Sequence, residues 1–418
     1  MTQASLTQLC LLLHPSIGKT DIKTLFQDLN KIDWEGLVNL AGQYNLIPIL
    51  YGRLKTLDIL PFIPESLTEH LRVAYLANAT RNMLLLHEAG FIFTALKNAG
   101  IPAVGLKGLF LLENVYADIG MRQMSDLDIM LHKTHIPQAL NALETLGYQP
   151  TTYFDIRNEN VDIKHVPPLI KPEGPYYLEL HWTILEENEP FTINTHGLWD
   201  RAMPAIIADV DTLALSPEDL VMHLCLHLTY QHHLKLGLRG LYDIALVIDH
   251  YEKQLNWEKL IQIGQEWGAA RLTWLTLILV EEIFKGIIPP NVLDQMEPRD
   301  AQSWVLNTAR LQLLAGMPSG TPITPDIVNL ATEKGLLTRL KLILSRIFLP
   351  KTTLARIYNI SPTSYRIYGC YFQRFWGLLR GYAPTIKRVF QADDKVFEDV
   401  KNEQTSQQLK TWMTNNQS

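Results

Sequence analysis

The chain has 418 residues, of which 47% are hydrophobic and 19% are charged, so it is long enough for two or three domains with sizeable cores. Its formal net charge of −6 argues against a protein that coats nucleic acid. The cysteines are Cys10, Cys225 and Cys370, which are far apart and odd in number. This pattern argues against a disulfide framework or a cysteine-based metal site, and it suits a reducing cytoplasm.

Neither a targeting segment nor a membrane-spanning helix is expected. The apolar run near the start has no basic residues before it. The most apolar helical stretch begins at Leu272 and is interrupted by Glu281, Glu282 and Lys285, whereas a spanning helix needs about 20 mostly apolar residues. We therefore expect a cytoplasmic protein in which this helix lies in a core.

The pattern along the chain predicts an α+β fold, in which a small mixed sheet is flanked by N-terminal and C-terminal helical regions. Apolar residues at helical spacing fill the first part, and short strand-like runs that alternate with helices follow it. The predicted parts are an N-terminal helical region (1–97), an α/β core (98–205), a helical domain (206–330), a basic and aromatic helical region (331–390) and a polar tail (391–418).

Within the core, strands are expected at "IPAVGLKG" from Ile101 and at "SDLDIMLH" from Ser125, and helices at "LFLLENVYAD" and "IPQALNALETLGY". The runs "DIKHVPPLIK" and "YYLELHWTIL" are typical of an antiparallel pair of strands. Farther on, Ser216 with Asp219 three residues later predicts the start of a helix.

Three acidic residues stand where strands usually avoid charge. Asp126 and Asp128 are two residues apart, so on a strand they project to the same side. In "YYLELHW", Glu179 is an acid on another strand. Carboxylates on adjacent strands can hold one or two Mg²⁺ or Mn²⁺ ions, which orient substrate phosphates and lower the pKa of an attacking hydroxyl. We therefore predict that Asp126, Asp128 and Glu179 are metal ligands and catalytic residues.

A phosphate-binding loop is predicted upstream, in "VGLKGLFLL". Gly105 and Gly108 permit tight turns, and the backbone amides that begin the next helix can bind an anion. Lys107 adds a positive charge, although it can also be an ordinary lysine at a helix start. Arg122, just before the acidic strand, can reach phosphate as well. These four residues are the predicted nucleotide-binding set.

Several runs together resemble a known family: "LKG", "YADIGMRQMSDLDIML", "ALETLGY" and "LELHW", with "HLCLHLTYQHHLKLGLRGLYDIALVID" farther on. Over about residues 80–290 the sequence resembles the uncharacterised nucleotidyltransferase family of the DNA-polymerase-beta-like superfamily. The resemblance implies a small α/β core that binds Mg²⁺ and a nucleoside triphosphate such as ATP. It also implies metal-binding roles for Asp126 and Asp128, and a third-carboxylate role for Glu179.

The expected reaction is transfer of a nucleoside monophosphate from a nucleoside triphosphate to the hydroxyl of an unknown acceptor, with release of pyrophosphate. The superfamily pattern has Gly-Ser or Gly-Gly in the phosphate loop, where this chain has Lys107 and Gly108. The difference keeps open a non-catalytic protein of the same fold that binds a nucleotide or a partner. A metal-dependent phosphohydrolase is a further alternative.

Other assignments are open at individual residues. The two aspartates can instead belong to a surface strand, where they pair with Arg122 and Lys133. Arg122 can equally pair with Asp118 or with the first of these aspartates rather than with phosphate. His181 shares a face with the glutamate, and we expect it to support the site rather than to act as a catalytic base.

Four histidines gather in the predicted helical domain, at His223, His227, His232 and His233. The first two are four residues apart on a helix, a spacing that can hold Zn²⁺. The stretch "HLCLH" lacks the glutamate of the metalloprotease motif, so helix packing is favoured over zinc. On the next helix, Arg239 and Asp243 are also four apart, which predicts an ion pair, and contact of Asp243 with substrate is the alternative.

Residues 334–390 contain 11 Lys or Arg residues, ten aromatic residues and no acid. Basic charge interleaved with aromatic rings is typical of a surface that binds an anionic membrane or single-stranded nucleic acid. A third interpretation is a helical region packed against the acidic remainder of the chain. Nucleic acid is the least favoured partner, because no nucleic-acid-binding module is recognisable. Binding to a membrane would place the chain at the inner face of that membrane.

Overall fold

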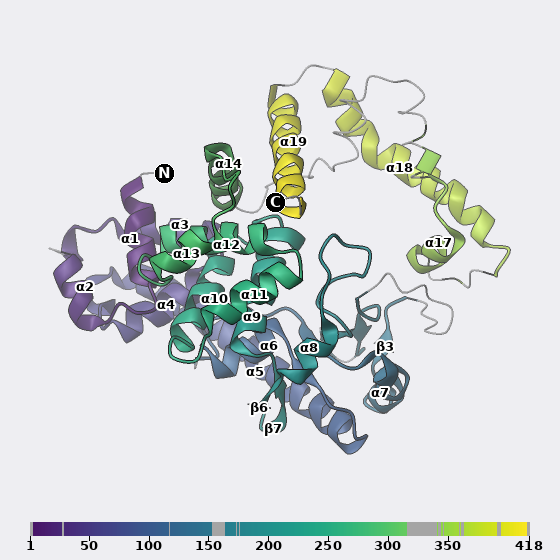
Figure 1. Cartoon of the computed structure of the whole chain (residues 1–418), viewed down its shortest axis with the longest axis horizontal. Coiled ribbons are helices and arrows are strands. Elements are labelled where there is room, and N and C mark those ends of the chain that lie inside the picture. The colour runs from purple at the N-terminus through teal and green to yellow at the C-terminus, as the bar shows by residue number, and fades with distance from the viewer. Residues whose placement is uncertain are drawn as a thin grey trace. The chain divides into compact units, whose positions relative to one another are not determined.

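The structure is a computed structural model that describes residues 3–26, 29–116, 118–152, 164–172, 174, 176–315, 341, 344–345, 347–358, 360, 363–390 and 394–415. The chain forms two compact units (Figure 1). The first comprises Met1–Gln149, Val161–Met317 and Trp412–Ser418, and the second comprises Pro150–Asn160 and Pro318–Thr411. The start of the predicted strand 162–171 and the first ten residues of the basic region lie outside the described residues.

Helices form the N-terminal part, as predicted. They are α1 (Gln3–Leu13), α2 (Lys19–Leu25), α3 (Trp34–Gln43), α4 (Ile47–Thr56) and α5 (Glu65–Asn98). Helix α3 begins where the Asp33 carboxylate accepts a hydrogen bond from the Gly36 amide. Leu9, Leu37 and Leu50 are fully buried where α1, α3 and α4 pack together. The much longer α5 continues from this bundle to the sheet, so it can present side chains to the site.

A seven-stranded mixed sheet forms the core, which confirms the predicted α+β fold. Its strands are β1 (Val104–Gly105), β2 (Leu127–Met130), β3 (Gln149–Pro150), β4 (Leu169–Ile170), β5 (Tyr177–His181), β6 (Met203–Ile207) and β7 (Val210–Ala214), in the order β3-β4-β5-β2-β1-β7-β6. Strand β2 is parallel to β5 and β1 is parallel to β7, whereas β4 and β5 are antiparallel, as predicted. Helices α6 (Lys107–Asn114) and α7 (Ile136–Glu144) connect these strands.

The sheet continues to Ala214, so the predicted end of the core at residue 205 falls inside β6. Strands β6 and β7 form a hairpin whose turn residues, Ala208 and Asp209, have φ of +51° and +59°. Turns of this kind usually contain Asn or Gly, and their absence hides the hairpin in the sequence. The acidic strand is also shorter than predicted: β2 begins at Leu127, so Asp126 lies just before it.

Helices cover the region after the hairpin. They are α8 (Thr195–Asp200), α9 (Pro217–Cys225), a π-helix (Leu226–Gln231), α10 (Gly237–His250), α11 (Trp257–Glu266), α12 (Ala270–Ile283), α13 (Pro290–Met296) and α14 (Ser303–Leu314). Ser216 caps α9 by accepting a hydrogen bond from the Asp219 amide, as predicted. Helix α12, which contains the most apolar stretch, buries Leu272 and Leu275. Among the described residues, every helix falls short of the length and apolarity that crossing a membrane requires.

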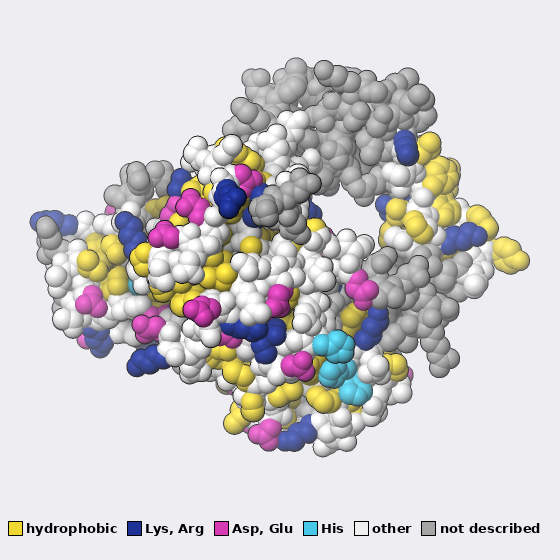
Figure 2. All heavy atoms as spheres, in the orientation of Figure 1, with side chains coloured by type: hydrophobic (Ala, Val, Ile, Leu, Met, Phe, Trp, Pro, Cys, Tyr) yellow, Lys and Arg dark blue, Asp and Glu magenta, His cyan; other side chains and the backbone are white. Residues whose placement is uncertain are grey.

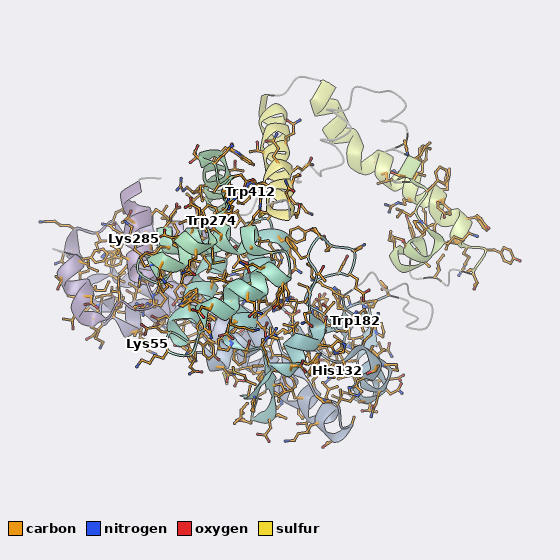
Figure 3. The ribbon with its side chains drawn as sticks, viewed as in Figure 1. Lys55, His132, Trp182, Trp274, Lys285 and Trp412 are labelled. Carbon is orange, nitrogen blue, oxygen red and sulfur yellow. The ribbon has the colours of Figure 1, made fainter. Side chains whose placement is uncertain are left out.

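The predicted polar tail is helical where it is described. Helix α19 (Asp394–Thr414) follows α17 (Lys351–Ile357) and α18 (Ile367–Phe390) along the chain. At the end of α19, Trp412 packs edge-on against Trp274 with ring centroids 6.2 Å apart (Figure 3). The guanidinium of Arg271 lies over the Trp412 ring, 5.4 Å from its centroid. The polar tail is thus a helix over its described residues, and the buried Trp412 anchors the last turn of that helix.

Candidate active site

Two acidic side chains lie side by side in the middle of the sheet. Strands β2 and β5 run parallel, and Asp128 and Glu179 are opposite one another in their register. Paired residues on neighbouring strands present their side chains to the same face of the sheet. Asp128 is only 3% exposed, whereas Glu179 is partly exposed. The structure thus brings together two of the three predicted carboxylates.

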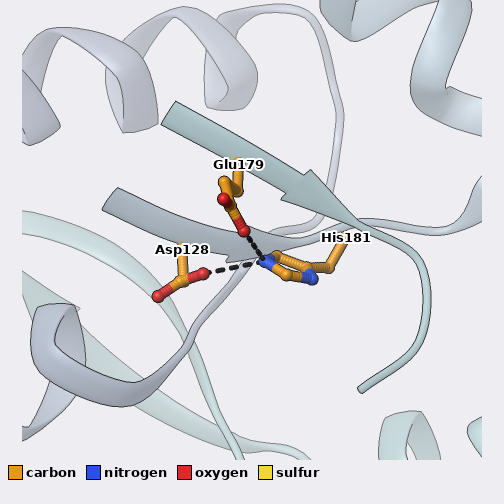
Figure 4. Close-up of side chains that lie close together, drawn as sticks. All are labelled: Asp128, Glu179 and His181. Carbon is orange, nitrogen blue, oxygen red and sulfur yellow. Dashed lines mark hydrogen bonds and ion pairs between the residues drawn. The ribbon is translucent and has the colours of Figure 1, made fainter. Parts of the chain in front are cut away.

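His181 links these two carboxylates (Figure 4). Its Nε2 lies 2.8 Å from Asp128 Oδ1 and 3.4 Å from Glu179 Oε2. Because both neighbours are acceptors, this arrangement places the ring proton on Nε2, which donates a hydrogen bond to them, and only the tautomer with the proton on Nδ1 leaves Nε2 free to bind a metal. The ligand atoms of these three side chains all lie within 4.8 Å of one another, which is compatible with a metal site. His181 was expected only to support the site, and the geometry adds that it holds both acids directly.

Lys107 has an unusual backbone conformation at the start of α6. Its φ is +45°, in a region that residues other than glycine seldom adopt and that is often found at functional sites. The side chain is 11% exposed, and its Nζ lies 3.0 Å from Asp128 Oδ1. An ordinary lysine at a helix start would extend into solvent, so that alternative does not describe Lys107. The predicted phosphate-binding lysine forms a buried ion pair with a predicted metal ligand.

Charge keeps Asp128 ionised in spite of its burial. Burial alone would raise the pKa of the Asp128 carboxyl, but the charge of Lys107 and the hydrogen bond from His181 hold it well below its ordinary value. For Lys107, burial lowers the pKa and Asp128 raises it more, so the ammonium stays charged. The hydrogen bond from His181 lowers the pKa of Glu179. The site therefore holds two carboxylates in their anionic form at neutral pH.

Asp126 lies beside this group without joining its shortest contacts. Its Oδ1 accepts a hydrogen bond of 3.0 Å from the Ser125 hydroxyl, just before β2 begins. Burial and the nearby charge of Asp128 both raise the pKa of the Asp126 carboxyl. Both aspartates line the same cavity. Asp126 therefore faces the cavity just before β2 begins. The side chain that contacts both Asp128 and Glu179 is His181.

Arg122 is held by a partner that the sequence did not indicate. Its Nε and Nη2 donate to the two carboxylate oxygens of Asp243, each at 3.0 Å, and both side chains are buried. The Tyr116 hydroxyl donates to the same carboxylate at 2.6 Å. Pairing of Arg122 with Asp118 or Asp126 was therefore wrong, and so was the predicted helical ion pair between Arg239 and Asp243. Arg122 also donates from Nη1 to the Gln123 carbonyl at 3.3 Å, so it supports the loop before β2, and it lines the cavity in front of the aspartates as well.

The two glycines of the predicted phosphate loop differ in role. Gly105 lies in β1, where an added Cβ would come within 2.2 Å of Ile207 Cδ1, so it permits close packing of the sheet. It is not among the residues that line the cavity. Gly108 does line the cavity, and a Cβ there would lie 2.5 Å from Arg122 Nη1. The prediction that Gly105 forms a phosphate-binding turn is thus not supported by its position in a strand.

The cavity in front of the aspartates has a volume of about 650 Å³. The sheet side contributes the two aspartates with Lys107 and Gly108, α5 contributes Arg81, and the helical region contributes His227, His232 and Arg239. Arg239 is partly buried and makes no hydrogen bond or ion pair to any described residue. Burial and the nearby charge of Arg122 lower the pKa of Arg239, so an anion bound there would relieve a repulsion.

Two histidines of the helical region contact one another and Gln231. The chain changes from α-helix to π-helix at Leu226, and His227 lies in this wider turn, a feature that is frequent at functional sites. His227 Nδ1 lies 3.1 Å from Gln231 Oε1, and its ring meets that of His232. Within the described part of the chain, the histidines of this region form no metal-ligand group. The favoured interpretation of helix packing fits this arrangement.

Burial of His223 predicts a loss of stability in mild acid. Burial lowers the pKa of His223, which is 1% exposed, well below the ordinary histidine value of about 6.5. As the pH falls below 6.5, the unfolded chain binds a proton at this position and the folded chain does not. The free energy of unfolding should then fall by about 1.4 kcal/mol per pH unit from this residue alone. Urea unfolding at pH 7 and pH 5.5 measures this slope, and His223→Gln should reduce it. An equal slope in wild type and variant would contradict the assignment.

Several residues of the site carried no recognised signal in the sequence. Asn78 and Asn82 of α5 both donate to the Arg122 carbonyl, at 3.1 and 2.7 Å, and so hold the loop before β2. His165 lies beside Glu179, with its Nε2 4.0 Å from Oε2. The available signal was a pair of asparagines four apart on one face of a long helix. His165 reaches the site through an isolated bridge to His181, a long-range contact that its own stretch of sequence does not specify.

The fold is a mixed α/β core, and carboxylates and cations line one cavity beside its sheet. A nucleotidyltransferase of the class that the sequence resembles is expected to have this combination. A family described as "Uncharacterised nucleotidyltransferase" matches residues 30–285, more than half of the chain. The chain therefore belongs to the uncharacterised nucleotidyltransferase family, which supports nucleotidyl transfer as its general class of activity. No curated protein and no solved structure matches the chain.

Proposed function

We propose that the protein transfers a nucleoside monophosphate from a nucleoside triphosphate to an acceptor hydroxyl in a Mg²⁺-dependent reaction. The observation that supports this most is the composition of one cavity. Asp126 and Asp128 enter it from the sheet, and Lys107 and Arg239 enter it from two helices. A metal-bound triphosphate needs both kinds of group, acids for the metal and cations for the phosphates.

The residues present fit a magnesium ion. Carboxylate oxygens are the ligands that Mg²⁺ prefers, and Asp126, Asp128 and Glu179 would supply them. The raised pKa of Asp126 reflects burial and repulsion from Asp128, and a divalent cation between them would relieve that repulsion. When bound, Mg²⁺ would neutralise phosphate charge and lower the pKa of the attacking hydroxyl. His181 would keep Asp128 and Glu179 aligned during this process.

The cations divide into structural and ligand-binding groups. Arg122 lines the cavity, but its two hydrogen bonds to the buried Asp243 carboxylate lead us to assign it a structural role. Arg239 lines the cavity and makes no hydrogen bond or ion pair to a described residue, so we assign the phosphates to it, with Lys107 at the α6 start. Arg81 on α5 is exposed at the cavity edge and can contact the same anion.

The proposed transfer balances without a further reactant. The acceptor oxygen bonds to the α-phosphorus, and the bond from that phosphorus to the bridging oxygen breaks. Pyrophosphate leaves with the electron pair. The hydroxyl proton passes to a carboxylate, for which Glu179 is the candidate general base, because it is ionised and partly exposed beside the cavity acids. Release of pyrophosphate is therefore the signature of the reaction.

Nucleotide binding should raise the thermal stability of the protein only when Mg²⁺ is present. At a ligand concentration of 100 Kd, binding to the folded state adds about 2.7 kcal/mol to the free energy of unfolding. Thermal unfolding with each nucleoside triphosphate, with and without Mg²⁺ or Mn²⁺, measures this effect. Asp126→Asn should remove most of the Mg²⁺-dependent part. Asp211→Asn, at an exposed aspartate of β7, is the control and should leave it unchanged.

The ion pair between Lys107 and Asp128 favours one alternative, a non-catalytic binding protein of the same fold. In that protein the lysine would hold the place of the metal permanently. The two functions differ in a pyrophosphate-release screen over hydroxyl-bearing sugars, metabolites, peptides and proteins. Protection by nucleotide without Mg²⁺, and no release with any acceptor, would support the binding protein. Release of orthophosphate without an acceptor would instead indicate a phosphohydrolase.

A further inference from the structure

Helices α17 and α18 form a small hairpin-like cluster of their own within the second unit. Ile367 and Cys370 of α18 are buried with Leu354 and Ala355 of α17. Tyr371 packs against this cluster, and its hydroxyl donates to the Leu349 carbonyl at 2.8 Å. One stripe of α18 is therefore buried by contacts with α17 and with Leu349, which precedes α17.

A second stripe of α18 is aromatic and exposed. Tyr368 is 60% exposed, Phe372 is 69%, Phe375 is 37% and Trp376 is 48%. Steps of four, three and one residues place these rings on one face of a helix, opposite Ile367 and its buried neighbours. Phe372 and Trp376 are nearly parallel, with ring centroids 6.3 Å apart. Large exposed apolar patches of this kind usually mark an interaction surface.

Positive charge surrounds the aromatic stripe. Residues 334–390 contain 11 Lys or Arg and no acid, so all 43 acidic residues of the chain lie elsewhere. Lys351, Arg366 and Arg380 are exposed around the stripe, and Lys351 Nζ lies 4.8 Å from the centre of the Tyr368 ring. Figure 2 shows hydrophobic and basic side chains together over α17 and α18. The surface is therefore apolar at its centre, basic around it and complementary to an anion.

We propose that this face of α17 and α18 binds the surface of an anionic phospholipid bilayer. A helix with an aromatic face flanked by basic residues lies in the headgroup region, where its rings leave water and its cations meet the lipid charge. Tryptophan and tyrosine favour that region in particular. Two further apolar side chains extend the surface: Phe348, which is 63% exposed, and Ile357, which is 50% exposed. Such groups gain from burial in lipid, whereas binding of a single strand of nucleic acid depends on stacking and phosphate contacts.

Vesicle co-sedimentation of the full chain tests this proposal. Vesicles of phosphatidylcholine alone are compared with vesicles that also contain phosphatidylserine, at low and high salt. We expect binding to the anionic vesicles, weaker binding at high salt and little binding to the neutral ones. The double variant Phe372→Ser/Trp376→Ser should bind at least tenfold more weakly. Arg366→Gln/Arg380→Gln should lose mainly the salt-sensitive part.

Leu311→Ser is the matched control, because Leu311 is 73% exposed on α14 of the first unit. It should bind vesicles as the wild type does. Thermal stability and protection by nucleotide should be unchanged in all three variants, which separates this inference from the proposed function. No binding to anionic vesicles at low salt, or equal binding by Phe372→Ser/Trp376→Ser, would overturn it. Tight binding of single-stranded RNA in place of vesicles would do the same.

Discussion

Asp128→Asn is expected to lower the free energy of unfolding by about 3–5 kcal/mol, because it leaves Lys107 charged and buried without its partner. The asparagine keeps the size of the side chain and still accepts a hydrogen bond from His181, so packing changes little. The same substitution removes a predicted metal ligand, and Mg²⁺-dependent transfer should fall at least about a hundredfold. Urea unfolding and the pyrophosphate assay measure the two effects separately.

A second variant separates the ion pair from the chemistry. In Lys107→Met/Asp128→Asn the buried charges are removed together, so stability should recover by more than half of the loss in Asp128→Asn, while activity stays absent. Glu179→Gln, at a more exposed carboxylate, should lower activity with a smaller loss of stability. If Asp128→Asn proved as stable as the wild type, the buried ion pair would not exist as described. Recovery of activity in the double variant would contradict a metal-binding role for Asp128.

The sequence predicted the part of the site that depends on short-range spacing. The two-residue period of strands placed Asp126 and Asp128 on one strand and Glu179 on another. Asp128 and Glu179 pair in register, whereas Asp126 lies just before β2. The helix start at Ser216 followed from local capping chemistry. These predictions succeed because one or two neighbouring residues decide them. The family resemblance supplied long-range information, because it implied that the two acidic strands lie next to one another.

Long-range contacts could not be predicted in the same way. Arg239 and Asp243 are four apart, and a helical pair of this kind contributes about 0.2–0.5 kcal/mol. Arg122 lies 121 residues away from Asp243, yet it makes two buried hydrogen bonds to the same carboxylate. Leaving a buried charge unpaired costs several kcal/mol, so the buried partner prevails over the local one. Nothing in the spacing of residues reveals which loop will reach the helix.

Irregular backbone explains the remaining differences between the elements predicted from the sequence and those in the structure. The hairpin at Ala208 and Asp209 has left-handed turn residues without glycine or asparagine. His227 lies in the π-helix that begins at Leu226 and lines the cavity, and no residue in "LHLTYQ" specifies such a turn. Both depend on packing by residues far away in the chain. In this chain the sequence therefore predicts whether a segment is a helix or a strand well. It predicts poorly which neighbours an individual side chain contacts.

Arg122 and Arg239 should behave in opposite ways when each is replaced by methionine. Arg122→Met leaves the buried Asp243 carboxylate without its main partner, so the free energy of unfolding should fall by about 3–5 kcal/mol. Arg122→Met/Asp243→Asn should recover much of this loss. Arg239→Met removes a partly buried charge that makes no hydrogen bond or ion pair to a described residue. Its stability should stay within about 0.5 kcal/mol of the wild type.

Nucleotide affinity should be more sensitive to the loss of Arg239 than to the loss of Arg122, the reverse of what is expected for stability. A hydrogen bond from a guanidinium to phosphate contributes about 1.5–3 kcal/mol, so Arg239→Met should weaken binding of a nucleoside triphosphate about 10- to 150-fold. Arg122→Met, measured below its unfolding transition, should bind within a few-fold of the wild type, because its guanidinium is engaged by Asp243. Calorimetric titration with a non-hydrolysable triphosphate and Mg²⁺ gives both affinities. Unchanged binding by Arg239→Met, together with loss of binding in folded Arg122→Met, would return the phosphate role to Arg122 and show that the Asp243 pair opens when nucleotide binds.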